Sequence, residues 1–163
     1  MKHLVVLAHP RTGSFTHQVC DTWCATVREL GHEVVLRDLY AMRFNPVASP
    51  EEAYTRPPQA PAPDVQVEME HLVAADAVSF IAPVWWIAPP AILKGWLDRV
   101  LRGGGFAYGY GPNGPTGTLR GKTATVFSSA GSTQQEFLTS GKMDATSRTS
   151  VAVLNVRMPD REK

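Results

Sequence analysis

Four apolar runs recur along the chain, and three segments with helical periodicity separate them. The runs are rich in Val, Leu, Ile, Phe and Ala, and the first of them, residues 3–8, is continuously apolar, which is typical of a strand buried on both faces of a sheet. These strand candidates cover residues 3–8, 32–39, 77–83 and 122–130. The helical segments cover residues 17–30, 64–76 and 89–101. Strands that alternate with helices predict a doubly wound parallel α/β sheet with helices on both faces.

The first helical segment has a clear apolar face. Val19, Trp23 and Val27 recur every four residues, and Cys20 and Cys24 lie beside them. Side chains with this spacing share one side of an α-helix, so we expect them to pack on the sheet. The two cysteines are interpreted as reduced core residues, because a metal site at this position would lack its other ligands.

Polar residues and a glycine mark the ends of this helix. Ser14 and Thr16 are both suitable N-caps, and Gly31 fits the C-terminal end. A strand, a helix and a second strand follow one another within the first 39 residues. This βαβ unit predicts parallel strands joined by a right-handed crossover.

Two other segments lack a helical or strand period. Residues 41–63 contain six prolines and are interpreted as a long surface loop rather than a linker between domains. Residues 103–117 are rich in glycine and are expected to form an extended loop, with Phe106, Tyr108 and Tyr110 on one side. Exposed rings of this kind indicate an interface, and the alternative is that they fold back onto the preceding helix.

Composition and charge narrow the functional classes. The length of 163 residues suits one domain, residues 1–163, and the formal net charge is only +1 at pH 7. Because there is no basic stretch, we expect no nucleic acid partner and no insertion into a membrane. The N-terminal apolar run ends at His9, which is too short for a signal peptide or a membrane span and favours a cytoplasmic protein.

Three loops follow predicted strand ends, where open parallel sheets bind their ligands. Residues 9–16 combine Gly13, hydroxyl groups and a helix start, which suit a phosphate, although a simple helix cap is the alternative. Residues 83–90 contain two adjacent tryptophans, which either cover a cofactor or pack in a core or interface. Residues 128–133 are small, so that the backbone can approach a flat ring closely. Together, the three loops favour a phosphorylated planar cofactor.

Two phosphate-binding signatures are missing from the sequence. It contains neither GxxxxGK(S/T) nor a GxGxxG that follows a strand, and its three consecutive glycines follow a helix. These absences argue against a nucleoside triphosphate and against a dinucleotide bound in the Rossmann manner.

Three stretches make the sequence similar to a known family. They read AHPRTGSFTH, APVWWIAPPAILKGWLDRVL and GFAYGYG, and the second is specific because it is long and irregular. On these stretches, which span roughly residues 1–140, the chain resembles the flavodoxin-like NAD(P)H:quinone oxidoreductase family. The resemblance implies a flavodoxin-like sheet with strand order 2-1-3-4-5. It also implies FAD as the cofactor, with FMN as the alternative, and NAD(P)H as the electron donor.

The resemblance further implies which residues bind the cofactor and the substrate. In the family, the first loop holds the flavin phosphates, the second surrounds the isoalloxazine ring and the third completes the site. The corresponding positions are His9, Ser14, Phe15, Thr16, Pro83, Val84, Trp85, Trp86, Ile87, Ser129, Ala130, Gly131 and Ser132. Tyr108 and Tyr110 match aromatic positions that reach the substrate pocket of the other subunit, which implies a homodimer. No catalytic proton-transfer residue can be assigned, and no metal is implied.

Four residues of the second stretch are interpreted outside the cofactor site. Trp96 is assigned to packing, and Lys94 is expected at the helix surface or at a cap. Asp98 and Arg99 either support a dimer or belong to a solvated face of the helix.

The C-terminal residues 144–163 match the family poorly. Residues 149–158 supply a candidate fifth strand, but no amphipathic helix follows them, so an incomplete C-terminal end is one interpretation. The main functional hypothesis is NAD(P)H-dependent, two-electron reduction of quinones or similar acceptors by ping-pong hydride transfer. The alternatives are a flavin-binding regulatory or ancillary subunit of an ion-transport system, and an inactive fragment.

Overall fold

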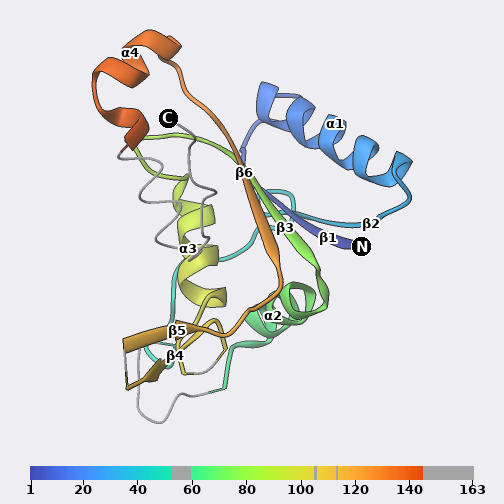
Figure 1. Ribbon diagram of the computed structural model, residues 1–163, viewed down its shortest axis with the longest axis vertical. Coiled ribbons are helices and arrows are strands. Elements are labelled where there is room, and N and C mark those ends of the chain that lie inside the picture. The colour runs from blue at the N-terminus through green and yellow to red at the C-terminus, as the bar shows by residue number, and fades with distance from the viewer. Residues whose placement is uncertain (53–59, 105, 113, 145–163) are drawn as a thin grey trace.

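A parallel sheet of four strands forms the centre of the part of the chain that the computed structural model describes, residues 1–52, 60–104, 106–112 and 114–144 (Figure 1). The strands are β1 (Lys2–Leu7), β2 (Glu33–Asp38), β3 (Ala77–Pro83) and β6 (Thr123–Ser129). They lie in the order β2-β1-β3-β6, and all three pairs are parallel. This confirms the flavodoxin-like order for the first four strands. The predicted fifth strand, at residues 149–158, lies outside the described residues.

Helices cover both faces of this sheet, as the alternation of elements predicted. The longer helices are α1 (Phe15–Glu29), α2 (Pro63–Ala74) and α3 (Ala91–Val100), and α4 (Gln134–Thr139) is a short helix after β6. In Figure 1, α1 lies on one side of the strands, while α2 and α3 lie on the other. The packing of side chains shows the same division, because each face of the sheet has its own hydrophobic core.

The side chains of β1 alternate between these two cores. Leu4 and Val6 belong to the core under α2 and α3, whereas Val5 and Leu7 pack under α1. The neighbouring strand β3 is buried along its whole length. A strand that is covered on both faces favours apolar residues along its length, which explains why β3 is apolar at every position except Ser79.

The structure selects one of the two predicted caps of α1. Ser14 is the N-cap, and its Oγ accepts a hydrogen bond from the backbone N–H of His17 at 3.3 Å. Thr16 is a residue of the first turn, so its assignment as an alternative cap was wrong. Cys20 and Cys24 are free and buried in the core under α1, which confirms their interpretation as core residues.

The glycine-rich segment after α3 contains a hairpin, which corrects the prediction of an extended loop. β4 (Tyr108–Gly111) and β5 (Gly114–Gly117) pair in antiparallel fashion. Phe106 packs against the core under α2 and α3, so it follows the alternative in which the rings fold back. The rings of Tyr108 and Tyr110 contact each other at 5.9 Å, and Tyr110 remains exposed.

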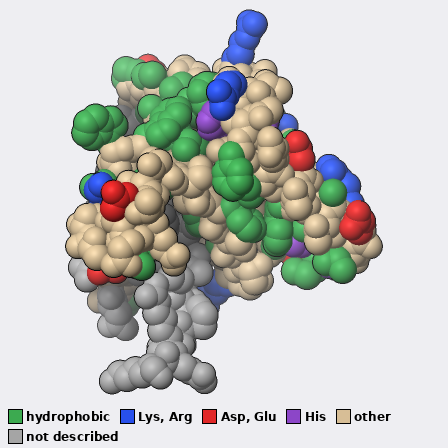
Figure 2. All heavy atoms as spheres, turned by 90° about the horizontal axis from the view of Figure 1, so that it is seen from above, with side chains coloured by type: hydrophobic (Ala, Val, Ile, Leu, Met, Phe, Trp, Pro, Cys, Tyr) green, Lys and Arg blue, Asp and Glu red, His purple; other side chains and the backbone are tan. Residues whose placement is uncertain are grey.

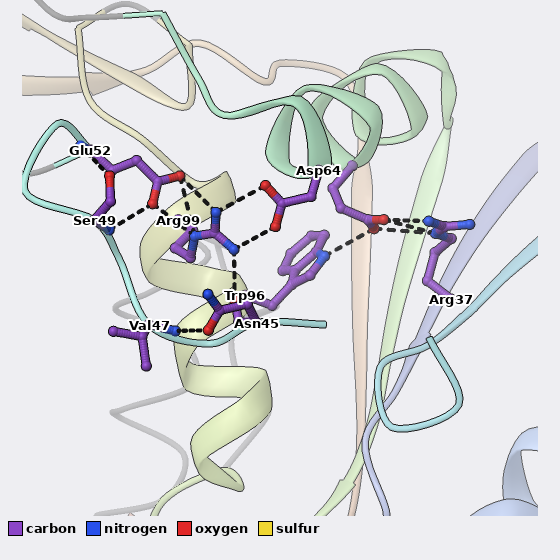
Figure 3. Close-up of polar contacts among 9 residues, drawn as sticks. Arg37, Asn45, Val47, Ser49, Glu52, Asp64, Trp96 and Arg99 are labelled. Atoms are coloured by element: carbon purple, nitrogen blue, oxygen red, sulfur yellow. Dashed lines mark hydrogen bonds and ion pairs between the residues drawn. The ribbon is translucent and has the colours of Figure 1, made fainter. Parts of the chain in front are cut away.

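Arg99 occupies neither a solvated helix face nor a surface free to support a dimer, which corrects both interpretations offered from the sequence. Its side chain is only 4% exposed and lies between α3, α2 and the loop after β2 (Figure 3). The guanidinium donates hydrogen bonds to Glu52 Oε1 at 2.9 Å, Asp64 Oδ2 at 2.7 Å and the backbone oxygen of Asn45 at 2.7 Å. The proline-rich segment is therefore tied down at residues 45–52.

Other residues of α3 agree with their predicted roles. Trp96 is fully buried in the core under α2 and α3, and its indole Nε1 donates to Glu68 Oε2 at 3.0 Å. Glu68 also accepts from Arg37 Nε at 3.0 Å, so the buried carboxylate is paired (Figure 3). Lys94 lies at the surface, where it forms an ion pair with Asp98.

Neither a membrane-spanning helix nor a metal-binding cluster occurs within the described ranges. No helix there is long and apolar enough to cross a membrane. No group of three or more His, Cys, Asp or Glu side chains in the same ranges is arranged to hold a metal ion.

Candidate functional site

The three predicted loops meet at the end of the sheet where the carboxyl ends of its parallel strands lie. The ring of His9, after β1, lies 6.3 Å from the ring of Trp85, after β3. The backbone N–H of Val84 donates to the carbonyl of Ser129, at the end of β6, at 2.8 Å. Figure 2 looks onto this edge and shows hydrophobic side chains gathered on it. The fold therefore brings together three loops that are far apart in the sequence.

The start of α1 has the features of an anion site. Ser14 caps the N–H of His17, and its carbonyl accepts from Gln18, but the N–H groups of Phe15 and Thr16 have no acceptor among the described residues. No acidic residue lies in the first turn. Free donors at the positive end of a helix favour a phosphate or another anion. The sequence prediction for this loop is consistent with this geometry.

The two tryptophans lie in a tight turn. The backbone of Trp85 and the backbone of Ala88 exchange hydrogen bonds of 2.9 and 3.0 Å. Trp86 and Ile87, the two central residues, have φ angles of 52° and 64°. This left-handed conformation is uncommon for residues other than glycine and costs on the order of 1–2 kcal/mol each. Backbone strain of this kind is often found at functional sites.

Both central residues of this turn face away from the core. The side chain of Trp86 is 99% exposed, and those of Trp85 and Ile87 are also exposed. The backbone N–H groups of Trp86 and Ile87 make no hydrogen bond within the described structure. The turn thus presents aromatic surface and two free donors, a combination that suits the polar edge of a flat ring. Pro83, at the end of β3, is buried and anchors the turn to the sheet.

The third loop contributes accessible backbone. A side chain placed at Gly131 would meet nothing within 4 Å, so the space beside this backbone is open. Ser129 is half-buried at the end of β6, Ala130 is exposed, and Ser132 is half-buried before α4. The backbone at Gly131 is therefore accessible to a ligand.

Tyr108 and Tyr110 do not join the three loops. They lie on β4, and Figure 1 shows the β4–β5 hairpin near the end of α3 that is remote from the carboxyl ends of the strands. Within one chain, these two tyrosines are therefore separate from the candidate site. Their predicted role in a substrate pocket requires a second subunit.

His17 is a candidate site residue that the sequence reasoning missed. It is buried in the first turn of α1, with Nδ1 at 2.9 Å from Ser14 Oγ and Nε2 at 3.5 Å from Asp38 Oδ2. Its ring also contacts that of His9, at 6.0 Å between centroids. Two sequence signals point to it, its place as the last residue of the stretch AHPRTGSFTH and the serine three residues earlier, whereas Asp38 reaches the site only through the pairing of β1 with β2.

Comparison with known proteins identifies the family. A family model described as a flavodoxin-like fold matches residues 1–156. The chain belongs to the flavodoxin-like family. A relative from Haemophilus influenzae, named as an uncharacterized NAD(P)H oxidoreductase, is 37% identical over 138 residues, which make up 84% of this chain and 68% of that protein. NAD(P)H dehydrogenase (quinone) 1 of Rattus norvegicus is 38% identical over 124 residues.

A solved structure supports the same flavodoxin-like fold. The NAD(P)H:quinone oxidoreductase from Methanothermobacter marburgensis is 33% identical, with a TM-score of 0.81 and coverage of 95% of this chain and 78% of that chain. The lengths differ among the relatives. The match with the rat enzyme covers 66% of this chain and only 45% of that protein.

Proposed function

We propose that the protein is an NAD(P)H-dependent flavin oxidoreductase that reduces quinones or similar flat acceptors. The observation that carries the proposal is the meeting of an anion-binding helix start and a strained aromatic turn at one edge of a flavodoxin-like sheet. The relatives named above, an NAD(P)H oxidoreductase and two quinone-reducing enzymes by name, support the same activity.

The donors at this edge fit a flavin at both of its ends. The free N–H groups of Phe15 and Thr16 suit the phosphate end. The free N–H groups of Trp86 and Ile87 suit the oxygen and nitrogen acceptors of the ring. We propose FAD as the cofactor. FMN is the alternative, because it also carries the ring and a phosphate.

The chain itself contributes binding, orientation and exclusion of water. A bound flavin would supply the hydride chemistry, by taking two electrons from NAD(P)H and passing them to the acceptor. Backbone donors in the tryptophan turn would orient the ring, and the exposed indole of Trp86 would cover it from water. The residues of the third loop, Ser129, Ala130, Gly131 and Ser132, would lie beside the ring, and the open space next to Gly131 keeps its backbone accessible.

We also propose a homodimer and a shared slot for donor and acceptor. Tyr108 and Tyr110 lie away from the three loops of their own chain, so a second subunit would have to bring them to the substrate. Because a flat donor and a flat acceptor would use the same aromatic surface in turn, the kinetics should be ping-pong.

Reconstitution with flavin tests the proposal directly. Purified protein is mixed with FAD or FMN, and the uptake of each is measured by fluorescence. NADH or NADPH oxidation is then followed with and without a quinone. We expect a yellow protein and a quinone-dependent rate, with parallel lines in double-reciprocal plots. A colourless protein that takes up neither flavin would refute the proposal.

The same measurements separate the alternatives. Flavin uptake without turnover would favour a regulatory or ancillary subunit of an ion-transport system, and failure to fold alone would favour an inactive fragment. The relatives reported above include no ion-transport subunit, so none of them favours the first alternative.

A further inference from the structure

His3 is a histidine at the start of the buried strand β1, and the proposed function gives it no role. It lies on the same side of the strand as Val5 and Leu7, which belong to the core under α1. Its ring meets the edge of the Trp23 ring at 6.3 Å and lies within 18° of parallel to the ring of His32 at 5.5 Å. His3 therefore lies where the sheet, α1 and the turn after this helix come together.

The polar atoms at this contact have no hydrogen-bond partners in the part of the chain that the structure describes. Both ring nitrogens of His3, Nδ1 and Nε2, are buried and unpaired, and so is the indole Nε1 of Trp23. A neutral imidazole carries one N–H donor, whereas a protonated one carries two donors and a charge. The indole nitrogen is itself only a donor, so it cannot accept a second proton's hydrogen bond from His3. The contact therefore tolerates the neutral ring better than the charged ring.

The titratable groups around the ring add to this preference. His32 and the terminal ammonium of Met1 form one group, in which the ammonium lies 3.3 Å from His32 Nδ1. The carboxylate that acts on His3 belongs to Asp76, just before β3, but its Oδ2 already accepts the backbone N–H of Lys2 at 2.7 Å. The tryptophan of α1 that contacts the ring carries no charge. Burial lowers the pKa of His3 most, His32 and the ammonium lower it further, and Asp76 only partly opposes them.

We propose that His3 is a pH-sensitive switch, which holds α1 on the sheet while its ring is neutral and weakens this contact when the ring is protonated. The contact joins β1 to α1 through Trp23, whose ring also packs on Phe127 of β6 at 5.0 Å. A charge on His3 therefore acts where the helix rests on two strands. The inference does not depend on the proposed function, because no ligand takes part in it.

The direction of the pH dependence follows from the lowered pKa of His3 in the folded protein. In the unfolded chain, this histidine should take up its proton at the ordinary value of about 6.5. As the pH falls below this value, the unfolded chain binds the proton more readily than the folded protein does. The contact therefore contributes its full stability above about pH 6.5, and this contribution is lost as the pH falls toward the lowered pKa.

Urea denaturation of the full chain at about pH 7.5 and about pH 5.5 tests the proposal. His3→Phe keeps a ring against Trp23 and His32 but cannot take up a proton. Between the two pH values, the equilibrium constant for unfolding should rise by about five- to tenfold more in the unmodified protein than in His3→Phe. Glu52 and Asp64, whose pKa values are lowered, keep their charge throughout this range and do not contribute to the difference.

Two further variants separate the titration of His3 from its packing. His3→Gln replaces the ring with a neutral amide, so it should also lose this component of the pH dependence, even where its stability at both pH values is lower. His71→Gln removes a half-buried histidine from the last turn of α2 and should keep the pH dependence of the unmodified protein. A pH dependence that persists in both His3 variants would overturn the inference.

Two measurements on the unmodified protein need no variant. In nitrogen-15 NMR, the ring of His3 should stay neutral in the folded protein at a pH where the same ring is protonated in urea. Amide hydrogen exchange, corrected for the intrinsic rate at each pH, should show a loss of protection at about pH 5.5 in residues 23–29 of α1. Equal titration of His3 in the folded and unfolded states, or a loss of protection spread evenly over the four strands, would overturn the inference.

Discussion

At the scale of single residues, Trp86 is the position where local strain and exposure coincide. A fully exposed tryptophan in a left-handed turn gains nothing from packing and loses on the order of 1–2 kcal/mol in backbone strain. Such a residue does not contribute to the stability of the isolated chain. Its physical role therefore has to come from something that binds against it.

Substitution of Trp86 separates binding from stability. Trp86→Ala should weaken flavin binding by about 1–3 kcal/mol through the loss of buried aromatic area. It should change the free energy of unfolding of the flavin-free protein by less than about 0.5 kcal/mol, since the side chain is exposed. Fluorescence titration and urea denaturation measure the two quantities.

Trp23 provides the matched control for this prediction. Its ring packs against Phe127 at 5.0 Å in the core under α1. Trp23→Ala should therefore destabilise the flavin-free protein by about 3 kcal/mol. If Trp86→Ala destabilised the protein equally and left flavin affinity intact, Trp86 would have a packing role instead.

At the scale of elements, Arg99 joins α3, α2 and the loop after β2. Its guanidinium forms ion pairs with Glu52 and Asp64, and the side chain of Arg99 itself is almost fully buried (Figure 3). The loop lies so close to α3 that a Cβ at Gly95 would clash with the backbone oxygen of Pro46. The ion pairs and this close contact together hold the loop against the helix.

Removal of the Arg99 guanidinium should destabilise the folded protein. Arg99→Met leaves two carboxylates without their cation, and we expect a loss of about 3–5 kcal/mol in the free energy of unfolding. Lys94→Met on the same helix breaks an exposed pair with Asp98 and should cost no more than about 0.5 kcal/mol. Equal effects of the two substitutions in urea denaturation would show that the buried network does not stabilise the fold.

The same network makes the free energy of unfolding depend on pH in the acidic range. Burial alone would raise the pKa of Glu52, but hydrogen bonds from Arg99 and from the backbone of Ser49 outweigh it and lower the pKa. Hydrogen bonds from Arg99 also lower the pKa of Asp64. Groups with a lowered pKa in the folded state stabilise it above their ordinary values, and this contribution is lost as the pH falls through the lowered values.

Denaturation at several pH values checks the sign of this effect. Stability should fall from about pH 4.5 downward in the unmodified protein, as protons compete with Arg99 for the carboxylates. In Arg99→Met the buried Glu52 and the partly exposed Asp64 lack a cation, so this component of the acid dependence should disappear or reverse. An unchanged acid dependence in the variant would place the sensitive groups elsewhere.

At the scale of the whole molecule, we expect the flavin-loaded protein to be a homodimer. Tyr110 is 64% exposed on the β4–β5 hairpin, in a position to reach a second subunit. Tyr110→Ala should weaken association by about 1–2 kcal/mol in sedimentation experiments, whereas Leu30→Ala, at an exposed apolar position after α1, should not. A monomer that reduces quinone at full rate would refute the expectation.

Local patterns were sufficient to predict much of the fold and part of the site. Largely apolar runs identified β1 and β3, which are mostly buried between the two helix layers, and shorter apolar stretches identified β2 and β6, which are more exposed. Spacing of four identified the core face of α1, and a serine before the first turn identified its cap. These features depend on neighbours in the sequence, so they can be read from it.

Contacts between distant residues could be found only in the tertiary structure. Arg99 finds Asp64 and Glu52 at sequence separations of 35 and 47 residues, and His17 finds Asp38 through the pairing of two strands. The sequence around Arg99 does not mark it as buried and paired, and for His17 the neighbouring Ser14 indicates only one of its two partners. The left-handed turn at Trp86 was equally hidden, because no glycine marks it.

The sequence by itself determined which segments become strands and helices and which loops carry aromatic rings, hydroxyls and free backbone donors. Local periodicity and capping fix these features within a few residues along the chain. The tertiary structure alone decided that Arg99 meets Glu52 and Asp64, that His17 meets Asp38, and that the tyrosine hairpin lies away from the three loops. It did so because strand order and the burial of charged partners depend on packing between segments far apart in the chain.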